Sequence, residues 1–289
     1  MLSFVPDETM VKIQYKIKMG KSLNLNDPQL FSEKLQAYKL YYRDPVMIRC
    51  VDKYDVKAYL SEKGLGDIVV PTYGIYDSAD EIDWNALPEK FVIKDTLGGG
   101  GTAVIIVTDK NNADFSEIKK RTSEWVSINA HGKDAGREWP YYSGKQHRII
   151  IEKYLEGAGD EGLVDYKFFC FDGKVDNVMV CVERETGEPK FYFFDEKWNL
   201  LRLNRRGKAA PEGFTLPKPE SMDRMFGLAA ELSKGFPFVR VDLYTCGGKI
   251  YFGEMTFFPA SGYDSNILPE ADVYLGKLLD VSRFVHGNK

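Results

Sequence analysis

The chain has 289 residues, of which 44% are hydrophobic and 28% charged, and its 39 Lys and Arg against 43 Asp and Glu give a formal net charge of −4. This is the composition of a globular protein with ample material for a core, and it argues against disorder and against a general nucleic-acid binder. The four cysteines and three histidines lie far apart in no zinc or disulfide spacing, which argues against a zinc hydrolase and a disulfide scaffold.

Helical and strand patterns are mixed along the chain. Apolar residues at helical spacing predict helices, and β-branched runs bounded by turn residues predict strands. In chain order the pattern predicts helices at 28–44 and 51–64, short strands at 67–76, a hairpin at 90–109 and a helix at 115–130. These are followed by a strand and a chain reversal at 147–157, hairpins at 165–183 and 190–203, a helix at 222–236, a hairpin at 238–257 and a helix at 273–285. Hairpins mixed with helices, without steady strand–helix alternation, favour an α+β fold.

The last predicted hairpin brings acidic residues together. Side chains alternate faces along a strand, so Arg240 and Asp242 share one face of the first strand, and Glu254 and Thr256 share one face of the second. A turn centred near Gly248 would place Asp242 opposite Glu254 and Arg240 opposite Thr256. Two opposed carboxylates repel unless a positive charge lies between them, and Mg²⁺ is the obvious candidate. A solvated hairpin face with unrelated charges is the alternative.

A glycine-rich connection joins the two strands of the hairpin at 90–109. Lys94 ends the first strand, and the connection contains Gly98, Gly99, Gly100 and Gly101. Glycines expose backbone N–H groups and allow a phosphate chain to approach closely. The pattern is neither a Walker A loop nor a GxGxxG turn that opens a helix. A flexible hairpin loop remains the alternative.

Two further positions are candidates for nucleotide binding. Glu152 follows three apolar residues at the end of a strand, where its carboxylate could accept a hydrogen bond from an adenine amino group. Lys53 lies at the start of a predicted helix. Taken singly, Glu152 and Lys153 could equally be surface charges, and Lys53 a solvated helix lysine.

The order of these elements resembles that of the ATP-grasp superfamily, whose two α+β subdomains of antiparallel sheets close on ATP. The similarity covers residues 45–265 and rests on a DK pair, a strand lysine before a glycine-rich lid loop, an EKYL hinge, an R-x-D and a later E-x-N. These motifs match Asp52-Lys53, Lys94 with Gly98–Gly101, Glu152–Leu155, Arg240–Asp242 and Glu254–Thr256. Thr256 stands where the superfamily most often has Asn, which puts its usual second metal site in doubt.

Within the superfamily the chain is most similar to the TupA-like proteins, which are associated with teichuronic acid and other surface polysaccharides. The segments that carry this similarity are LNLNDPQLFSEKLQAYKLYYRD, VDKYDVKAYL, REWPYYSGKQHRIIIEKYL, DYKFFCFDGK and FGEMTFFPASG. Lys57 stands where the related pattern has Arg. The resemblance implies a short helical extension at residues 1–48, a subdomain with the lid loop at 49–150 and a subdomain with the metal site at 151–289.

The resemblance also implies ATP and Mg²⁺ as cofactors and assigns roles to individual residues. Lys94 and Arg240 would be catalytic, and Asp242, Glu254 and Thr256 would bind the metal. The nucleotide would contact Lys53, Lys94, Gly98, Gly99, Gly100, Gly101, Glu152, Lys153, Tyr154, Leu155 and Lys167.

The implied reaction is that of a carboxylate–amine ligase, which phosphorylates a carboxylate and passes the acyl group to an amine. We expect the carboxylate to be a uronic acid of a capsule or cell-surface polysaccharide precursor, free or nucleotide- or lipid-linked, and the amine to be an amino acid or simple amine. Basic residues that could bind this anionic substrate are Arg148, Arg202, Arg205 and Arg206.

Other activities remain open at this level. A glycosyltransferase would usually show a D-x-D pair, which the sequence lacks, whereas an ATP-dependent phosphotransferase would use the same ATP-binding residues. Retention of Lys94, Asp242 and Glu254 argues against a non-catalytic binding protein. No apolar segment approaches a membrane span or the core of a signal peptide, so we expect a cytoplasmic protein, peripheral at most to membrane-bound machinery. The oligomeric state is left open.

Overall fold

The computed structural model describes residues 4–99, 103–128, 136–142, 144–156, 163–183 and 186–285. The chain groups into two compact units. Unit 1 contains Met1–Arg43, Asp134–Trp139 and Gly157–Lys289, and unit 2 contains Asp44–Lys133 and Pro140–Glu156. Every strand pairing that the structure describes is antiparallel, and helices accompany both sheets, so the expected α+β class is confirmed.

Unit 2 contains a four-stranded sheet in the order β1-β4-β2-β3. Its strands are β1 (Thr72–Tyr76), β2 (Phe91–Asp95), β3 (Val104–Val107) and β4 (Ile149–Lys153). Its helices are α3 (Pro45–Val51), α4 (Asp55–Glu62) and α5 (Phe115–Val126), with 3₁₀ turns η1 (Gly66–Ile68), η2 (Ala79–Glu81), η3 (Trp84–Ala86) and η4 (Lys110–Asn112). The short α6 (Trp139–Tyr142) lies at the boundary of the units in the sequence.

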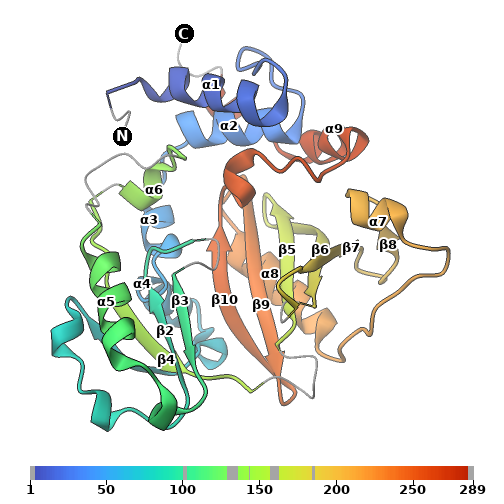
Figure 1. Ribbon diagram of the computed structural model, residues 1–289. Helices are drawn as coiled ribbons and strands as arrows, with labels where there is room; N and C mark the ends of the chain where they lie inside the picture. Colours follow the sequence, from blue (N-terminus) through green and yellow to red (C-terminus); the bar gives the residue numbers. More distant parts are fainter. Residues whose placement is uncertain are drawn as a thin grey trace. The chain divides into compact units, whose positions relative to one another are not determined.

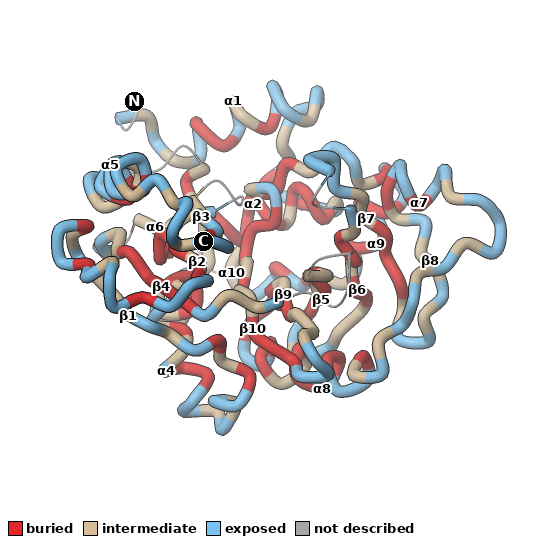
Figure 2. Tube along the Cα trace, turned by 60° about the horizontal axis from the view of Figure 1, so that its bottom comes forward, coloured by how far each residue is buried: buried red, intermediate tan, exposed pale blue. Residues whose placement is uncertain are grey.

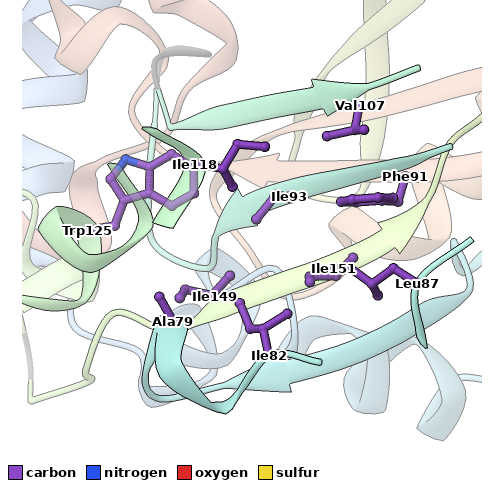
Figure 3. Close-up of a cluster of buried hydrophobic side chains, with 10 residues drawn as sticks. All are labelled: Ala79, Ile82, Leu87, Phe91, Ile93, Val107, Ile118, Trp125, Ile149 and Ile151. Carbon is purple, nitrogen blue, oxygen red and sulfur yellow. The ribbon is translucent and has the colours of Figure 1, made fainter. Parts of the chain in front are cut away.

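One face of the unit 2 sheet is apolar. Phe91, Ile93, Ile149 and Ile151 alternate with residues of the opposite face, and all four are fully buried. Figure 3 shows Ile118 and Trp125 of α5 lying over this apolar layer. The core of unit 2 therefore lies between α5 and this face, and the charged Glu152 and Lys94 lie on the opposite face of the sheet.

Unit 1 contains a six-stranded sheet in the order β10-β9-β5-β6-β7-β8 (Figure 1). Its strands are β5 (Asp165–Phe171), β6 (Lys174–Val182), β7 (Lys190–Phe194), β8 (Leu200–Leu201), β9 (Phe238–Cys246) and β10 (Lys249–Thr256). Its helices are α1 (Asp7–Met19), α2 (Phe31–Tyr41), α7 (Arg205–Ala209), α8 (Met222–Ser233), α9 (Pro269–Leu278) and α10 (Ser282–Val285), with the 3₁₀ turn η7 (Pro259–Gly262).

Helices cover parts of both faces of this sheet. On one face α8 packs Phe226 edge-on against Phe168 of β5, with ring centroids 5.1 Å apart. On the other face Phe31, at the start of α2, packs edge-on against Phe171 and Phe238. The strands between these contacts are almost continuously buried (Figure 2).

The N-terminal helices are joined to the C-terminal part of the chain. Asp272 of α9 accepts hydrogen bonds from the backbone N–H and the hydroxyl of Ser32, at distances of 2.7 and 2.8 Å. The Lys34 ammonium donates to the carbonyls of Gly276 and Leu279. Residues up to Arg43 therefore group with 157–289, whereas the sequence-based ranges placed residues 1–48 in an extension of their own.

Local chemistry explains where the predicted helices differ from the observed ones. The expected helix at 28–44 ends at Tyr41, because Pro45 forces the preceding residue into an extended conformation and Asp44 caps α3 through the N–H of Val46. The expected helix at 51–64 begins only at Asp55, after a turn in which Asp52 accepts from the N–H groups of Tyr54 and Asp55.

Close approach of α2 and α9 predicts different effects for two helical glycines. A methyl group at Gly276 would lie 2.2 Å from the Gln29 carbonyl oxygen, whereas one at Gly227 of α8 would meet nothing within 4 Å. We expect Gly276→Ala to lower the free energy of unfolding by about 1–3 kcal/mol. Gly227→Ala should raise it by up to about 1 kcal/mol. Urea denaturation of both variants measures this, and equal effects would contradict the packing argument.

Candidate functional site

The β9–β10 hairpin brings the predicted acidic residues together. Asp242 is paired with Glu254 and Arg240 with Thr256, so the expected register is confirmed. The turn, however, is centred between Gly247 and Gly248, both of which have positive φ. Counting back from this turn would pair Asp242 with Gly253. The observed register therefore requires one additional residue in β10.

That residue lies in a β-bulge between Phe252 and Glu254. In a regular ladder Glu254 would lie opposite Val241, which is fully buried on the other face of the sheet. The bulge places Glu254 beside Asp242 instead. A side chain at Gly253 would come within 2.9 Å of the Tyr244 ring and 3.0 Å of the Asp242 carbonyl oxygen, so the bulge is suited to glycine.

Arg240 connects the acidic groups of the hairpin. Its guanidinium donates from Nε and Nη2 to the two oxygens of Asp242, at 2.7 and 2.8 Å, and from Nη2 to Glu254 Oε1 at 2.9 Å. It also donates to the Thr256 hydroxyl at 3.0 Å, and that hydroxyl donates to Glu254. The fork geometry of arginine thus orients three side chains at once.

Strand β5 adds two charged groups to this cluster. Lys167 is paired with Asp242 across the sheet, and its ammonium forms ion pairs with Asp242 and Asp165. The sequence-based candidates include Lys167 but not Asp165. The two-residue alternation that places Lys167 on this face also places Asp165 there, so the strand pattern could have revealed it.

Burial controls the charges in this cluster. Burial raises the pKa of the Asp242 carboxyl, Arg240 and Lys167 oppose that shift, and the carboxylates of Asp165 and Glu254 add to it. For Lys167, burial lowers the pKa, but Asp242 and the other carboxylates outweigh this, and the net shift is upward. A cationic Lys167 is therefore the favoured state beside Asp242.

The donor chemistry of the cluster fits magnesium. Among the described residues, no group of three or more His, Cys, Asp or Glu side chains is arranged to hold a metal ion. Mg²⁺ is usually bound through one or two carboxylates, with water and substrate phosphates as the other ligands. Asp242 and Glu254 supply two carboxylates, and the Glu254 side chain is 39% exposed, compared with 1% for Asp242.

A second buried carboxylate lies in unit 2. Glu152 of β4 forms ion pairs through its two oxygens with Lys57 of α4 and Lys94 of β2. The Lys57 ammonium also donates to the Val70 carbonyl and the Thr72 hydroxyl. Lys94 and Glu152 were among the predicted site residues, and the structure brings them together. Lys57 was not among the predicted site residues. The family pattern usually has Arg at this position, which indicates that a cation is needed there.

The surroundings of Glu152 are partly apolar. Strand alternation places Glu152, Lys94, Val92 and Ile106 on the face of the sheet opposite α5. Ile106 is 60% exposed, and Glu152 only 4%. Burial alone would raise the pKa of the Glu152 carboxyl, but Lys94 and Lys57 outweigh it, so this pKa lies below its ordinary value.

The start of the glycine-rich connection is held by several contacts. The Lys53 ammonium donates to the Gly98 carbonyl, and Asp95 accepts from the N–H of Leu97 and pairs with His147. A methyl group at Gly98 would lie 2.4 Å from the Ala103 Cβ, whereas one at Gly99 would meet nothing within 4 Å. Gly100 and Gly101, also predicted to bind nucleotide, lie outside the described residues.

The segment after Glu152 leaves the sheet. Lys153 is exposed, and its backbone N–H donates to the Pro71 carbonyl. Tyr154 and Leu155 follow the end of β4 and are half-buried. Backbone groups beyond a strand end can hydrogen-bond a ligand edge, which is the role predicted for this segment.

The predicted substrate-binding arginines have different environments. Arg148 forms ion pairs with Asp52, which is fully buried, and with Asp55. Arg202 donates to four backbone carbonyls, those of Gly207, Lys208, Ala210 and Pro211. Arg202 therefore holds the loop around α7, while Arg205 and Arg206 are exposed on that helix.

The buried ion pairs of Glu152 predict that the stability of unit 2 depends on pH. Because its folded-state pKa is lowered, Glu152 contributes stability above the ordinary carboxyl pKa of about 4.3 and loses it as pH falls through the folded value. We expect Glu152→Gln to cost about 3 kcal/mol at neutral pH. Its difference from the wild type should shrink on acidification. Denaturant titrations at several pH values measure this.

Glu156→Gln provides the matched control, because Glu156 pairs with Lys90 on the surface. This variant should lose little stability at any pH. A Glu152→Gln variant with the same stability and acid response as the wild type would show that Lys57 and Lys94 do not depend on the carboxylate.

Three proteins of known activity illustrate what the chain is similar to. A D-alanine–D-alanine ligase of Aeromonas hydrophila is 22% identical in an alignment 285 positions long, and the match covers 89% of this chain and 82% of that protein. The D-alanine–D-alanine ligase of Bacillus anthracis in complex with ATP is 19% identical, with a TM-score of 0.48 over 79% of this chain and 61% of that one. The chain thus spans about three fifths of that ligase. A D-cycloserine synthetase is 16% identical, with a TM-score of 0.45 over 82% of this chain and 72% of that one.

The chain also matches the model of a known protein family. A family model described as TupA-like ATPgrasp matches residues 33–280, which include both sheets and both buried clusters. The expected family is therefore confirmed: the chain belongs to the TupA-like ATP-grasp family.

Proposed function

We propose that the chain is an ATP- and magnesium-dependent carboxylate–amine ligase that forms a carbon–nitrogen bond. Its carboxylate substrate is a uronic acid of a capsule or cell-surface polysaccharide precursor, such as one of teichuronic acid, and its amine is an amino acid or simple amine. The observation that carries this proposal is the cluster of Arg240, Lys167, Asp242 and Glu254 in a TupA-like ATP-grasp chain. The reaction takes place in the cytoplasm, where ATP is available.

The polar face of the unit 2 sheet contributes to nucleotide binding. Exposed Ile106 and half-buried Val92 supply apolar surface for an adenine ring beside Glu152. A carboxylate has lone pairs beyond those used by two lysines, so Glu152 can still accept from the adenine amino group. The segment Lys153–Leu155 supplies backbone groups to the ring edge.

Cations and backbone amides of the same unit serve the phosphates. Lys94 neutralises phosphate charge from the end of β2, and Lys53 positions the glycine-rich connection through Gly98. Residues Gly98–Gly101 allow close approach to the phosphates and exclude water, to which an acyl phosphate is sensitive.

The cluster of unit 1 serves phosphoryl transfer. Asp242 and Glu254 would hold Mg²⁺, and Thr256 orients Glu254. Magnesium, when bound, neutralises the phosphate oxygens. Arg240 stabilises negative charge on the transferring phosphoryl group. Burial raises the pKa of Asp242, and the ion pairs with Arg240 and Lys167 offset part of that shift.

The reaction balances in two steps. The γ-phosphoryl group passes from ATP to a carboxylate oxygen, which gives an acyl phosphate and ADP. The amine nitrogen then attacks the acyl carbon, the C–N bond forms, the C–O bond to phosphate breaks, and the amine gives up a proton. Exposed Arg205 and Arg206 would attract the anionic sugar, and Arg202 holds their loop in place. Arg148 would contribute positive charge while it remains paired with Asp52 and Asp55.

A substrate screen tests the activity. Purified protein with ATP and Mg²⁺ is offered amino acids crossed with free and nucleotide-linked uronic acids, and the products are read by mass spectrometry. We expect ADP release that requires both substrates, together with the mass of an amide. ADP release without any amine dependence, with a phosphorylated sugar as product, would favour a phosphotransferase. Turnover of a nucleotide sugar without ATP would favour a glycosyltransferase.

Substitution of one carboxylate tests the metal assignment. Glu254→Ala should reduce ADP release by about 10²-fold or more, because a group that stabilises transferring charge is lost. Its partly exposed position should leave the fold intact, which circular dichroism checks. Glu220→Ala, at an exposed position outside the cluster, should keep wild-type activity. Full activity of Glu254→Ala would contradict the assignment of Glu254 as a magnesium ligand.

A further inference from the structure

Helix α1 carries apolar side chains on its solvent-exposed side. Phe4 and Ile17 are the two most exposed large apolar residues in the described part of the chain, at 80% and 76%, and Ile13 is 48% exposed. Ile13 and Ile17 are four residues apart and therefore lie on one side of the helix. Single exposed apolar residues are ordinary, whereas residues 4–17 contain three: Phe4, which precedes α1, and Ile13 and Ile17, which form an exposed apolar patch on the helix.

The patch is not needed for packing within the helix pair. Helix α1 contacts α2 through its other side, where Val11 and Tyr15 are fully buried. The Tyr15 hydroxyl hydrogen-bonds the Ser32 hydroxyl of α2 at 2.8 Å. Figure 1 shows α1 lying along α2, and buried and exposed residues alternate along it in Figure 2. The helix thus has two apolar sides, of which only one is used by the fold.

Lysines accompany the exposed apolar side. Lys12 and Lys16 are exposed on α1, next to Ile13 and Ile17 in the sequence. Lys18 lies over the Tyr263 ring, and Lys21, with 44% of its side chain exposed, forms an ion pair with Asp272. Lys12 pairs with Glu8, and the acidic residues of the helix are confined to its first turn. An apolar strip bordered by lysines is the pattern of a helix that lies in the interface of an anionic membrane.

We propose that α1 docks the protein on an anionic lipid surface, with Phe4, Ile13 and Ile17 in the headgroup–acyl boundary and the lysines against lipid phosphates. A second copy of the chain is a poorer occupant, because a symmetric contact through this patch would bring lysines of like charge together. No helix of the described residues is long and apolar enough to cross a bilayer, so the attachment is peripheral. The proposal goes beyond the ligase activity and does not depend on it.

Vesicle binding tests the proposal. The full chain is floated with vesicles of phosphatidylcholine alone and of phosphatidylcholine mixed with phosphatidylglycerol. We expect binding only to the mixed vesicles, weakened by added salt. The double variant Ile13→Asp/Ile17→Asp should bind at least about tenfold more weakly, since both apolar contacts are lost. Ile128→Asp, which alters an equally exposed isoleucine of unit 2, should bind like the wild type.

Each other outcome overturns the proposal. It fails if the wild type ignores anionic vesicles, or if the double variant binds as tightly as the wild type. A concentration-dependent dimer that the double variant loses, without vesicle binding, would assign the patch to a second copy. Thermal unfolding checks that both variants are folded. ADP release measured without vesicles should be unchanged by Ile13→Asp/Ile17→Asp. Failure of the ligase proposal can therefore be told apart from failure of the membrane proposal.

Discussion

The buried ion pairs of Asp242 place the strictest demand on this structure. An ionised carboxylate withdrawn from water is costly unless cations and hydrogen bonds compensate it. Here Arg240 and Lys167 occupy both of its oxygens, and they reach it from its own strand and from the neighbouring one. Arg240 can reach both oxygens within β9, whereas Lys167 reaches Asp242 only when β5 and β9 are paired in the observed register. The pairing of β5 with β9 therefore completes the charged cluster.

Unit 2 repeats this arrangement with different parts. Glu152 is almost completely buried, and Lys57 and Lys94 reach it from a helix and from the neighbouring strand. In both units the charged side chains share a strand with apolar residues that point the other way, towards α5 in one unit and α8 in the other. Each sheet thus has one largely apolar face, and its other face holds charged side chains in a fixed geometry beside apolar residues such as Phe171 and Ile150. Such preorganised charge is what phosphoryl transfer requires.

Much of the site could be predicted because it depends on local patterns. Strand alternation with a turn placed near Gly248 predicted the pairing of Asp242 with Glu254, and the family motifs marked Lys94 and Glu152. The compensating details could not be predicted. The register is correct because of the bulge at Gly253, and nothing in the alternation of β10 requires a bulge. Arg202 looks like a substrate ligand in the sequence, yet its guanidinium is used by four backbone carbonyls.

The sequence by itself determined the α+β class, most element positions, the family and the acidic hairpin, because these follow from periodicity and short motifs. Only the tertiary structure decided which cation serves which carboxylate. Lys57 and Lys94 are 37 residues apart in the sequence numbering, and Glu152 lies far beyond both, so no local pattern links them. Tertiary structure also decided that the N-terminal helices belong with the C-terminal sheet, since Ser32 and Asp272 meet only after the chain has folded. Contacts between distant residues depend on how the apolar faces of helices and sheets pack together, and this packing cannot be read from local patterns in a single sequence.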